Sequence, residues 1–375
     1  MKAIESQAAS KPQAGVTDAG SGETIIFTNH VAQAVDEAVE RMAPTSVFVI
    51  ADVNTASFVL PRLQSESKAI GGAKVIMTKA GEMFKNIDTL AMIWKQLGDG
   101  GATGKSVVIN LGGGVITDMG AFAASTFKRG IPFINIPTTL LGAVDAAVGG
   151  KTGINFNSLK NEVGLFRQSE LVVISTTFFR TLTSQELLAG YAEMIKHAVL
   201  TSKEMTDRLL GYDVTAYDPD SLLALLQESV AVKCSFVNRD MEDKGVRRAL
   251  NFGHTVAHAF EALALERHSP LSHGYAVAFG MVAALVLSHM KCGFPSGELH
   301  RYAAYVSHHY GAFDISCDDY KRLLSFMHHD KKNASVDEIN CTLLRDYGDI
   351  AVNTPVADED MAAALDIYRD LLHIP

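Results

Sequence analysis

The segment Asn251 to His258, NFGHTVAH, contains residues that are suited to metal binding. His254 and His258 are four residues apart, so a helix would project both imidazoles from one face. Zinc or another divalent ion accepts two histidine nitrogens and a carboxylate, and leaves one coordination position open for substrate. Thr255 follows His254, so the segment lacks the HExxH pattern of zinc proteases. Spacing alone also allows a second interpretation, in which the two histidines share a helix face by chance and bind no metal.

A run of three glycines occurs in the segment Asn110 to Asp118, NLGGGVITD. Residues 107–109 predict a strand before it, and residues 116–127 predict a helix after it. Glycines let the backbone turn sharply and approach a ligand, and the amides of the following helix favour a pyrophosphate. The order is not GxGxxG, so a tight turn without a ligand is an equal alternative.

Two further segments carry charges that suit an anionic substrate. Gly149-Gly150-Lys151-Thr152 resembles the end of a P-loop, but Asp145 occupies the position of the first glycine, so the match fails. Lys151 in this turn still suits a phosphate, and an exposed loop lysine is the alternative. Glu193 and Lys196 would share one helix face, which fits either a simple ion pair or a site.

The elements around these segments change type near residue 176. Short apolar runs alternate with helical patterns up to residue 175, which predicts an α/β domain with a mostly parallel sheet. Its strands are expected at 46–50, 75–77, 107–109 and 133–136, and its helices at 86–97 and 116–127.

Beyond residue 175, long apolar segments at helical spacing predict an all-α domain. These segments are 183–210, 219–240, 252–266, 274–292, 296–310 and 317–329. We expect a flexible leader at 1–22, the α/β domain at 23–175 and the helical domain at 176–375.

The composition excludes several classes of protein. Lys and Arg number 33 against 42 Asp and Glu, and this net charge of −9 argues against nucleic acid or an anionic membrane as a partner. Four cysteines without a CxxC pair disfavour a disulfide framework and a thiolate zinc site. The longest apolar run, 276–287, has 12 residues, whereas a membrane helix needs about 20. The polar leader lacks a signal peptide pattern, so we expect a cytoplasmic protein.

Eight motifs in one order link these segments: GGGVITD, PTTLL, VDAAVGGKTGIN, KN, AEMIKH, LNFGHTVAH, HG and DKK. Over roughly residues 45–345 this order resembles the 3-dehydroquinate synthases, which belong to the wider sugar-phosphate cyclases. The resemblance implies an N-terminal α/β domain that binds NAD, a helical C-terminal domain that holds a divalent metal (zinc or cobalt), and an active site between them.

The resemblance also implies roles for individual residues. The metal ligands would be Glu193, His254 and His273. The NAD contacts would be Asp52, Asn54, Glu82, Lys85, Gly113, Gly114, Val115, Asp118, Thr138, Thr139, Asp145, Lys151, Lys160, Phe178 and Thr181. The substrate contacts would be Lys151, Asn161, Lys196, Lys233, Arg247, Asn251, His258, Lys331 and Lys332. Arg129 resembles a residue that reaches a neighbouring subunit's site, which implies a homodimer.

The implied reaction converts 3-deoxy-arabino-heptulosonate 7-phosphate into 3-dehydroquinate and phosphate. It would proceed by transient oxidation with NAD, β-elimination of phosphate, re-reduction, ring opening and intramolecular aldol closure. Arg247 suits the substrate carboxylate, because a guanidinium pairs with it bidentately. Lys151, Lys196 and Lys233 would supply further cations for the two anionic ends.

The chain departs from the family pattern at two positions: Tyr275 follows His273-Gly274 where the family commonly has Glu, and Asp243 stands where Glu is usual. Three enzymatic alternatives stay open: an amino-dehydroquinate synthase, a valiolone-type cyclase and a metal-dependent polyol dehydrogenase of the glycerol dehydrogenase type. A cyclase that has become a binding or scaffold protein is a fourth, but every expected ligand is present.

Overall fold

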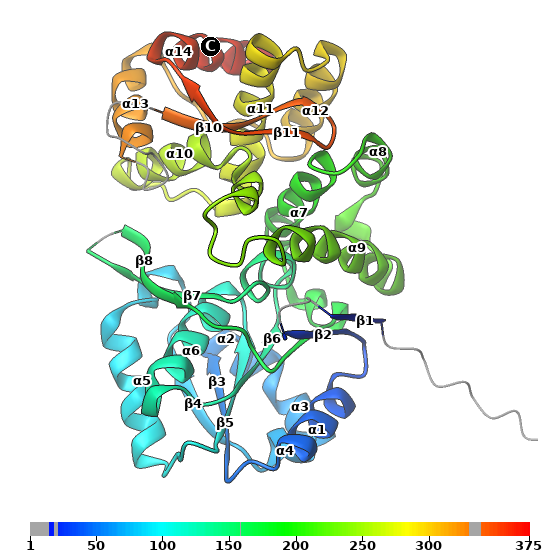
Figure 1. Ribbon diagram of the computed structural model, residues 1–375, viewed down its shortest axis with the longest axis vertical. Helices are drawn as coiled ribbons and strands as arrows, with labels where there is room; N and C mark the ends of the chain where they lie inside the picture. The colour runs from blue at the N-terminus through cyan, green and yellow to red at the C-terminus, as the bar shows by residue number, and fades with distance from the viewer. Residues whose placement is uncertain (1–14, 19–21, 158, 330–338) are drawn as a thin grey trace, which may run out of the picture.

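The computed structural model describes residues 15–18, 22–157, 159–329 and 339–375. Figure 1 shows two bodies, a sheet flanked by helices from the first half of the chain and a largely helical body from the second half. This architecture confirms the predicted fold class, an α/β domain with a mostly parallel sheet followed by a helical domain.

Seven strands form the main sheet in the order β1-β2-β9-β6-β5-β3-β4, and all neighbours are parallel except β1 and β2. Their bounds are β1 Gly15–Asp18, β2 Thr24–Phe27, β3 Val47–Asp52, β4 Lys74–Thr78, β5 Val107–Gly112, β6 Phe133–Pro137 and β9 Leu171–Ile174. The strands predicted at 46–50, 75–77, 107–109 and 133–136 are thus confirmed as β3, β4, β5 and β6.

Helices cover both faces of this sheet, which explains why its strands are continuously apolar. Along β3, Val49 packs in the same cluster as Val35 of α1, whereas Phe48 and Ile50 pack in the cluster that contains Ile93 of α5. The helices of this body are α1 Val31–Met42, α2 Val53–Phe58, α3 Leu60–Glu66, α4 Lys68–Gly71, α5 Ile87–Asp99 and α6 Gly114–Thr126.

The strand order reverses between β3 and β5. The chain runs from β3 to its neighbour β4 on one side, and then returns to place β5, β6 and β9 on the other side. Ligands of open α/β sheets bind at such a switch point, outside the carboxyl ends of the strands. Asp52 ends β3 and Gly112 ends β5, so both lie at this position.

The second body consists mainly of eight helices among the described residues. They are α7 Ser184–Val199, α8 Lys203–Leu210, α9 Pro219–Val237, α10 His254–Glu266, α11 His273–Cys292, α12 Ser296–His309, α13 Tyr320–His328 and α14 Asp358–Leu371. By length and composition α11 could cross a membrane, but 72% of its apolar window is buried. It packs against α7, α10 and α14, as expected of a core helix.

Several features were not predicted. Gly15–Asp18, expected in a flexible leader, form strand β1, because backbone pairing with β2 satisfies their polar groups. The helical body also contains the antiparallel hairpin of β10 (Ile339–Asp346) and β11 (Asp349–Val356). The predicted helix at 183–210 is interrupted after α7, and Ser202 caps α8 through a hydrogen bond from the Met205 amide.

A second hairpin extends from the α/β body. Its strands β7 (Lys151–Phe156) and β8 (Leu159–Phe166) pair antiparallel, and Figure 1 shows the hairpin between the sheet and the helical body. It therefore places residues of the first body close to α10.

Glycines allow the helices of the second body to pack closely. A Cβ on Gly280 of α11 would lie 2.2 Å from the Gly253 carbonyl oxygen, and one on Gly274 would lie 1.8 Å from that of Ala189. Since real Cβ atoms do not approach backbone this closely, both sites require glycine. The contacts set the spacing of α7, α10 and α11.

Replacing Gly280 with Ala should lower the free energy of unfolding by about 1–3 kcal/mol, the usual cost of overpacking a core. Gly297 of α12 is a matched control, because a Cβ there meets nothing within 4 Å. Gly297→Ala should stabilise the protein by up to about 1 kcal/mol through helix propensity. Urea denaturation measures both, and equal effects of the two substitutions would contradict this packing account.

Candidate active site

Residues expected to contact NAD follow the carboxyl ends of successive parallel strands. Asp52 ends β3, and the others follow strands: Glu82 after β4, Gly113 after β5, Thr138 after β6 and Phe178 after β9. Because these ends share one edge of the sheet, the fold brings the segments together there. Asn54, Val115, Thr139 and Thr181 lie within these same segments.

The glycine turn after β5 is closely packed against the segment after β6. A Cβ on Gly113 would lie 3.0 Å from Thr139 Cγ2, and one on Gly114 would lie 3.1 Å from the Ala146 Cβ. Gly113 is the N-cap of α6, so the free amides of this helix point to the edge where the strands end. The turn thus has the geometry that suits a pyrophosphate.

Lys85 connects two other expected site residues, Asp118 and Asn161. Its Nζ lies 2.6 Å from Asp118 Oδ2 and 2.5 Å from Asn161 Oδ1. Burial raises the pKa of the Asp118 carboxyl above its usual range, although Lys85 opposes this effect. Asn161, expected at the substrate, is therefore in contact with residues expected at the cofactor.

Three cations gather around the turn at Gly149. Lys233 Nζ of α9 lies 2.5 Å from Asp145 Oδ1, and Lys151 pairs with Asp243. Arg247, buried in the short helix η6 (Val246–Asn251), donates to the Gly149 carbonyl over 3.0 Å.

These three groups are close enough to influence one another. Burial lowers the pKa of Lys151, and the nearby charges of Arg247 and Lys233 lower it further, while Asp243 opposes them. Such a concentration of positive charge is suited to a ligand with more than one anionic group.

The buried carboxylate of Glu23 contacts the same turn at Gly149. The sequence analysis did not identify this residue. Its Oε2 accepts a hydrogen bond from the Gly149 amide (3.1 Å), and its Oε1 accepts from the Ser169 amide and hydroxyl (3.3 and 2.9 Å). The Gly149 peptide therefore links Glu23 to Arg247. A lone glutamate before a strand gives no local signal of such a role.

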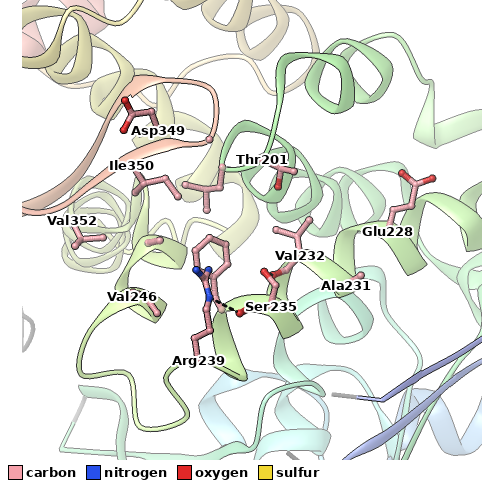
Figure 2. Close-up of a pocket in the computed structure, with 14 residues that line it drawn as sticks. Thr201, Glu228, Ala231, Val232, Ser235, Arg239, Val246, Asp349, Ile350 and Val352 are labelled. Carbon is pink, nitrogen blue, oxygen red and sulfur yellow. Dashed lines mark hydrogen bonds between the residues drawn. The ribbon is translucent and has the colours of Figure 1, made fainter. Parts of the chain in front are cut away.

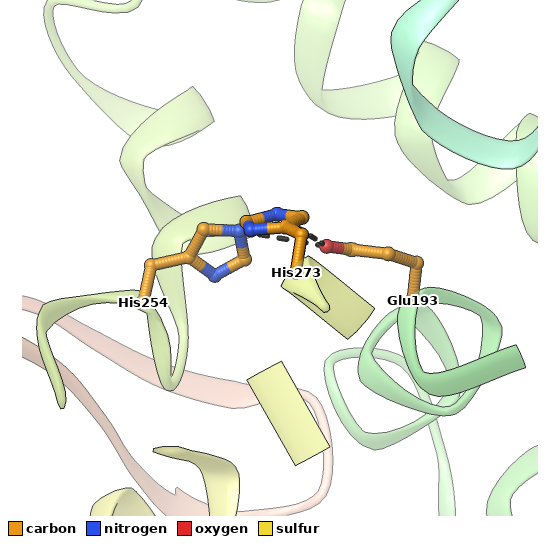
Figure 3. A group of neighbouring side chains, drawn as sticks. All are labelled: Glu193, His254 and His273. Carbon is orange, nitrogen blue, oxygen red and sulfur yellow. Dashed lines mark ion pairs between the residues drawn. The ribbon is translucent and has the colours of Figure 1, made fainter. Parts of the chain in front are cut away.

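Figure 3 shows the side chains of Glu193, His254 and His273 converging from α7, α10 and α11. Glu193 Oε1 lies 3.5 Å from His254 Nε2 and 3.6 Å from His273 Nε2. All three ligand atoms lie within 4.8 Å of one another. The structure therefore brings together the three residues that were expected to hold a metal.

The chemistry of these three groups fits a divalent metal ion. Glu193 Oε1 is buried, and no hydrogen-bond partner is found for it among the described residues. Ligand atoms of a tetrahedral zinc site, about 2.0–2.1 Å from the ion, are about 3.4 Å apart, close to the two distances from Glu193 Oε1 to the imidazoles. Burial disfavours the charged form of Glu193, but Lys196 and the two imidazoles hold its pKa well below the usual range.

In each of the two histidines, an oxygen atom lies within hydrogen-bond distance of Nδ1. His254 Nδ1 lies 3.2 Å from the Phe252 carbonyl oxygen, and His273 Nδ1 lies 3.3 Å from Glu261 Oε2. Both contacts favour the tautomer that carries the proton on Nδ1. The Nε2 atoms then present their lone pairs towards Glu193.

His258, the other histidine of the HxxxH pair, lies beside this cluster. Its ring centroid is 5.6 Å from that of His254 and 6.3 Å from that of His273. The spacing argument paired His254 with His258, whereas the three atoms within ligand distance belong to Glu193, His254 and His273.

The remaining expected site residues lie in different places. Lys196 is buried and pairs with Glu193, and Asn251 is half-buried at the end of η6. Arg129 is exposed beyond the carboxyl end of α6, about 20 Å from the glycine turn at its start. Lys331 and Lys332 lie outside the described residues.

The two departures from the family pattern have different surroundings. Asp243 forms an ion pair with Lys151, one of the three cations (Lys151, Lys233 and Arg247) that we call the cation group. Asp243 therefore lies beside this group. Tyr275 packs edge-on against Tyr310, with ring centroids 5.0 Å apart, and also contacts Phe279.

A cavity of about 740 Å³ is lined by residues of α9, η6 and β11 (Figure 2). Its lining includes Val232 and Ser235 of α9, together with Ile350 and Val352 of β11. None of the expected site residues lines it, so it is separate from the groups described above.

Comparison with known proteins assigns the fold and the family. The structure of 2-deoxy-scyllo-inosose synthase, solved with carbaglucose-6-phosphate, NAD+ and Co2+, superposes with a TM-score of 0.82 at 22% identity, covering 94% of this chain and 99% of that one. The 2-epi-5-epi-valiolone synthase of Streptomyces hygroscopicus, with NAD+ and Zn2+ bound, gives 0.81 at 25% identity over 97% and 99%. The fold is that of the sugar-phosphate cyclases.

Sequence comparison is more specific. Residues 75–189 match the N-terminal domain of 3-dehydroquinate synthase, and residues 190–333 match its C-terminal domain. The 3-dehydroquinate synthase of Parabacteroides distasonis is 43% identical over 93% of this chain and 99% of its own length, and that of Pyrococcus abyssi is 40% identical over 74% and 80%. The chain belongs to the 3-dehydroquinate synthase family, as its motifs predicted.

Replacing Glu23 with Gln should remove a pH-dependent part of the stability. Burial raises the pKa of Glu23 above its ordinary 4.5, so the folded state binds this proton more tightly than the unfolded state. The stability that this group contributes is therefore lost as the pH rises from 4.5 through the raised pKa. Urea denaturation should show that the wild type loses free energy of unfolding relative to Glu23→Gln over this window.

Glu170→Gln is the matched control, because Glu170 is exposed and lies next to Ser169, which contacts Glu23. Its stability difference from the wild type should change little with pH. A Glu23→Gln difference that stays constant, or that grows in favour of the wild type as the pH rises, would contradict the burial argument.

Proposed function

We propose that this chain converts 3-deoxy-arabino-heptulosonate 7-phosphate into 3-dehydroquinate and phosphate, as a phosphate-eliminating lyase that depends on NAD and on zinc or cobalt. The observation that carries the proposal is the position of the Lys151–Lys233–Arg247 cations beside the Glu193–His254–His273 group. Lys233 and Glu193 both act on the pKa of Asp145, which lies within electrostatic reach of each group. The substrate has a matching composition, with two anionic ends and several hydroxyls.

The cofactors are proposed from the site and from the relatives. The two cyclases of similar fold were solved with NAD+ and with Co2+ or Zn2+. When bound, NAD would supply reversible hydride transfer and the metal would supply Lewis acidity towards a substrate hydroxyl. Glu193, His254 and His273 would hold the metal ion, and the residues at the carboxyl ends of the strands would hold NAD.

The side chains that would bind substrate act by charge and shape. Arg247 is held by the Gly149 and Met241 carbonyls, which orient its planar guanidinium for a carboxylate. Lys233 would pair with the carboxylate beside Arg247, and Lys151 would neutralise the phosphate, which would itself accept the proton as it departs. The imidazole of His258, next to His254, would help to move that proton. Elimination, ring opening and aldol closure then depend mainly on electrostatic positioning.

The cation group also distinguishes the proposed substrate from the alternatives. A valiolone-type substrate lacks the carboxylate, so Arg247 and one lysine would have no partner. A polyol dehydrogenase needs no phosphate-binding lysines. The amino-dehydroquinate variant of the reaction would use the same groups, and activity must separate it from the proposed one.

We also propose a cytoplasmic homodimer with a domain boundary near residue 176. Arg129 supports the dimer, because it lies at the far end of α6 from its own subunit's glycine turn. It would therefore act at the site of the neighbouring subunit.

The activity test uses metal-loaded protein, the heptulosonate phosphate and a catalytic amount of NAD. Phosphate release should accompany 3-dehydroquinate in equal amounts over many turnovers, because the proposed reaction involves no net oxidation or reduction and would not consume NAD. Phosphate assay and chromatography of the product measure both. Accumulation of NADH in proportion to consumed substrate would indicate a dehydrogenase and contradict the proposal.

Replacing His254 with Ala should reduce the metal retained after desalting to background, since one of three ligand atoms is lost. The exposed His308 on α12 provides the control, and His308→Ala should retain the metal of the wild type. Elemental analysis measures both variants. Normal metal content in His254→Ala would refute the ligand assignment.

A further inference from the structure

The carboxylate of Glu261 in α10 contacts both bodies of the protein. Its Oε2 lies 3.3 Å from His273 Nδ1, and its Oε1 lies 2.6 Å from Lys160 Nζ. Glu261 is buried, whereas half of the Lys160 side chain is exposed. Lys160 belongs to β8 of the hairpin, so this chain of contacts runs from the α/β body to a proposed metal ligand.

A carboxylate in this position has a definite effect on an imidazole. It fixes the ring orientation and the Nδ1–H tautomer, and it raises the basicity of Nε2. His254 Nδ1 faces the Phe252 backbone carbonyl, so the two histidines contact different groups at Nδ1.

We propose that Glu261 is a positioning residue for the metal ligand His273, and that Lys160 fixes Glu261 in turn, so that the hairpin of the α/β body helps to set the geometry of the metal site. This inference rests on the metal dependence proposed above. Tyr275, where the family commonly has a carboxylate, packs against Tyr310. The carboxylate at His273 comes from Glu261.

The first test measures the dissociation constant for zinc by competition with a chelator, without substrate. Glu261→Gln keeps the size of the side chain but removes its charge, so the dissociation constant should rise about 10–100-fold. Glu266→Gln is the matched control, because Glu266 lies on the same helix and pairs with Arg322 at the surface. A constant within twofold of the wild type for Glu261→Gln would overturn the proposal.

If the Glu261→Gln variant does not fold, the same zinc measurement can be made on Glu261→Asp. It keeps the charge but is one methylene shorter, so it cannot span His273 and Lys160 together, and zinc binding should again weaken. The visible spectrum of the cobalt-loaded protein should change in either variant, because the geometry of one ligand changes. A wild-type spectrum with wild-type affinity would contradict the positioning role.

The second test is a double-mutant cycle between Lys160 and Glu261. Lys160→Met should change the zinc dissociation constant in the wild-type background, and this change should vanish in Glu261→Gln, because Lys160 acts only through Glu261. If Lys160→Met leaves the zinc dissociation constant unchanged in the wild-type background, the proposed role of Lys160 is wrong. An equal change in both backgrounds would show that its charge acts directly on the ion.

These measurements separate the inference from the proposed function. Zinc affinity is determined without turnover, so wild-type zinc affinity in Glu261→Gln would overturn the positioning role even in an active enzyme. Conversely, an inactive wild type that shows the predicted losses of zinc affinity would retain the inference and refute only the proposed reaction.

Discussion

The burial of the Glu193 carboxylate is the constraint on which the rest of the structure depends. A buried carboxylate is costly unless positive or donor groups surround it, and here Lys196 and the imidazoles of His254 and His273 do so. These groups come from three helices, so α7, α10 and α11 must pack unusually closely. The glycines at their contacts permit that approach, as the short distance from a Cβ on Gly280 to backbone shows. The close packing of these three helices and the geometry of the proposed metal site therefore depend on each other.

A second set of contacts places this helical body over the edge of the sheet where the strands end. Lys233 reaches the segment after β6 through Asp145, and Arg247 reaches the Gly149 carbonyl in the same segment. The ion pair between Lys160 and Glu261 makes a third connection, from the hairpin. Each connection uses a charged side chain expected to serve a ligand. The groups that join the two bodies are thus the groups proposed to bind cofactor and substrate between them.

The sequence predicts most of the α/β body, because β3, β5 and β6 are buried on both faces and leave continuous apolar runs. It did not predict β1 or the β10–β11 hairpin, which depend on pairing and tertiary packing rather than on local pattern. At the site, spacing alone paired His254 with His258, and only the family resemblance identified His273. The sequence analysis missed Glu23 and Glu261, because each contacts a residue distant in the sequence. Glu23 contacts Gly149, and Glu261 contacts His273 on the next helix.

The central claim is that Glu193, His254 and His273 form one metal site at the junction of three helices. A crystal structure of the zinc-loaded protein, with anomalous data at the zinc edge, tests it most directly. The account predicts a single strong anomalous peak about 2.0–2.1 Å from Glu193 Oε1 and from the Nε2 atoms of both histidines. A peak coordinated by other residues, or by His258 in place of His273, would contradict it.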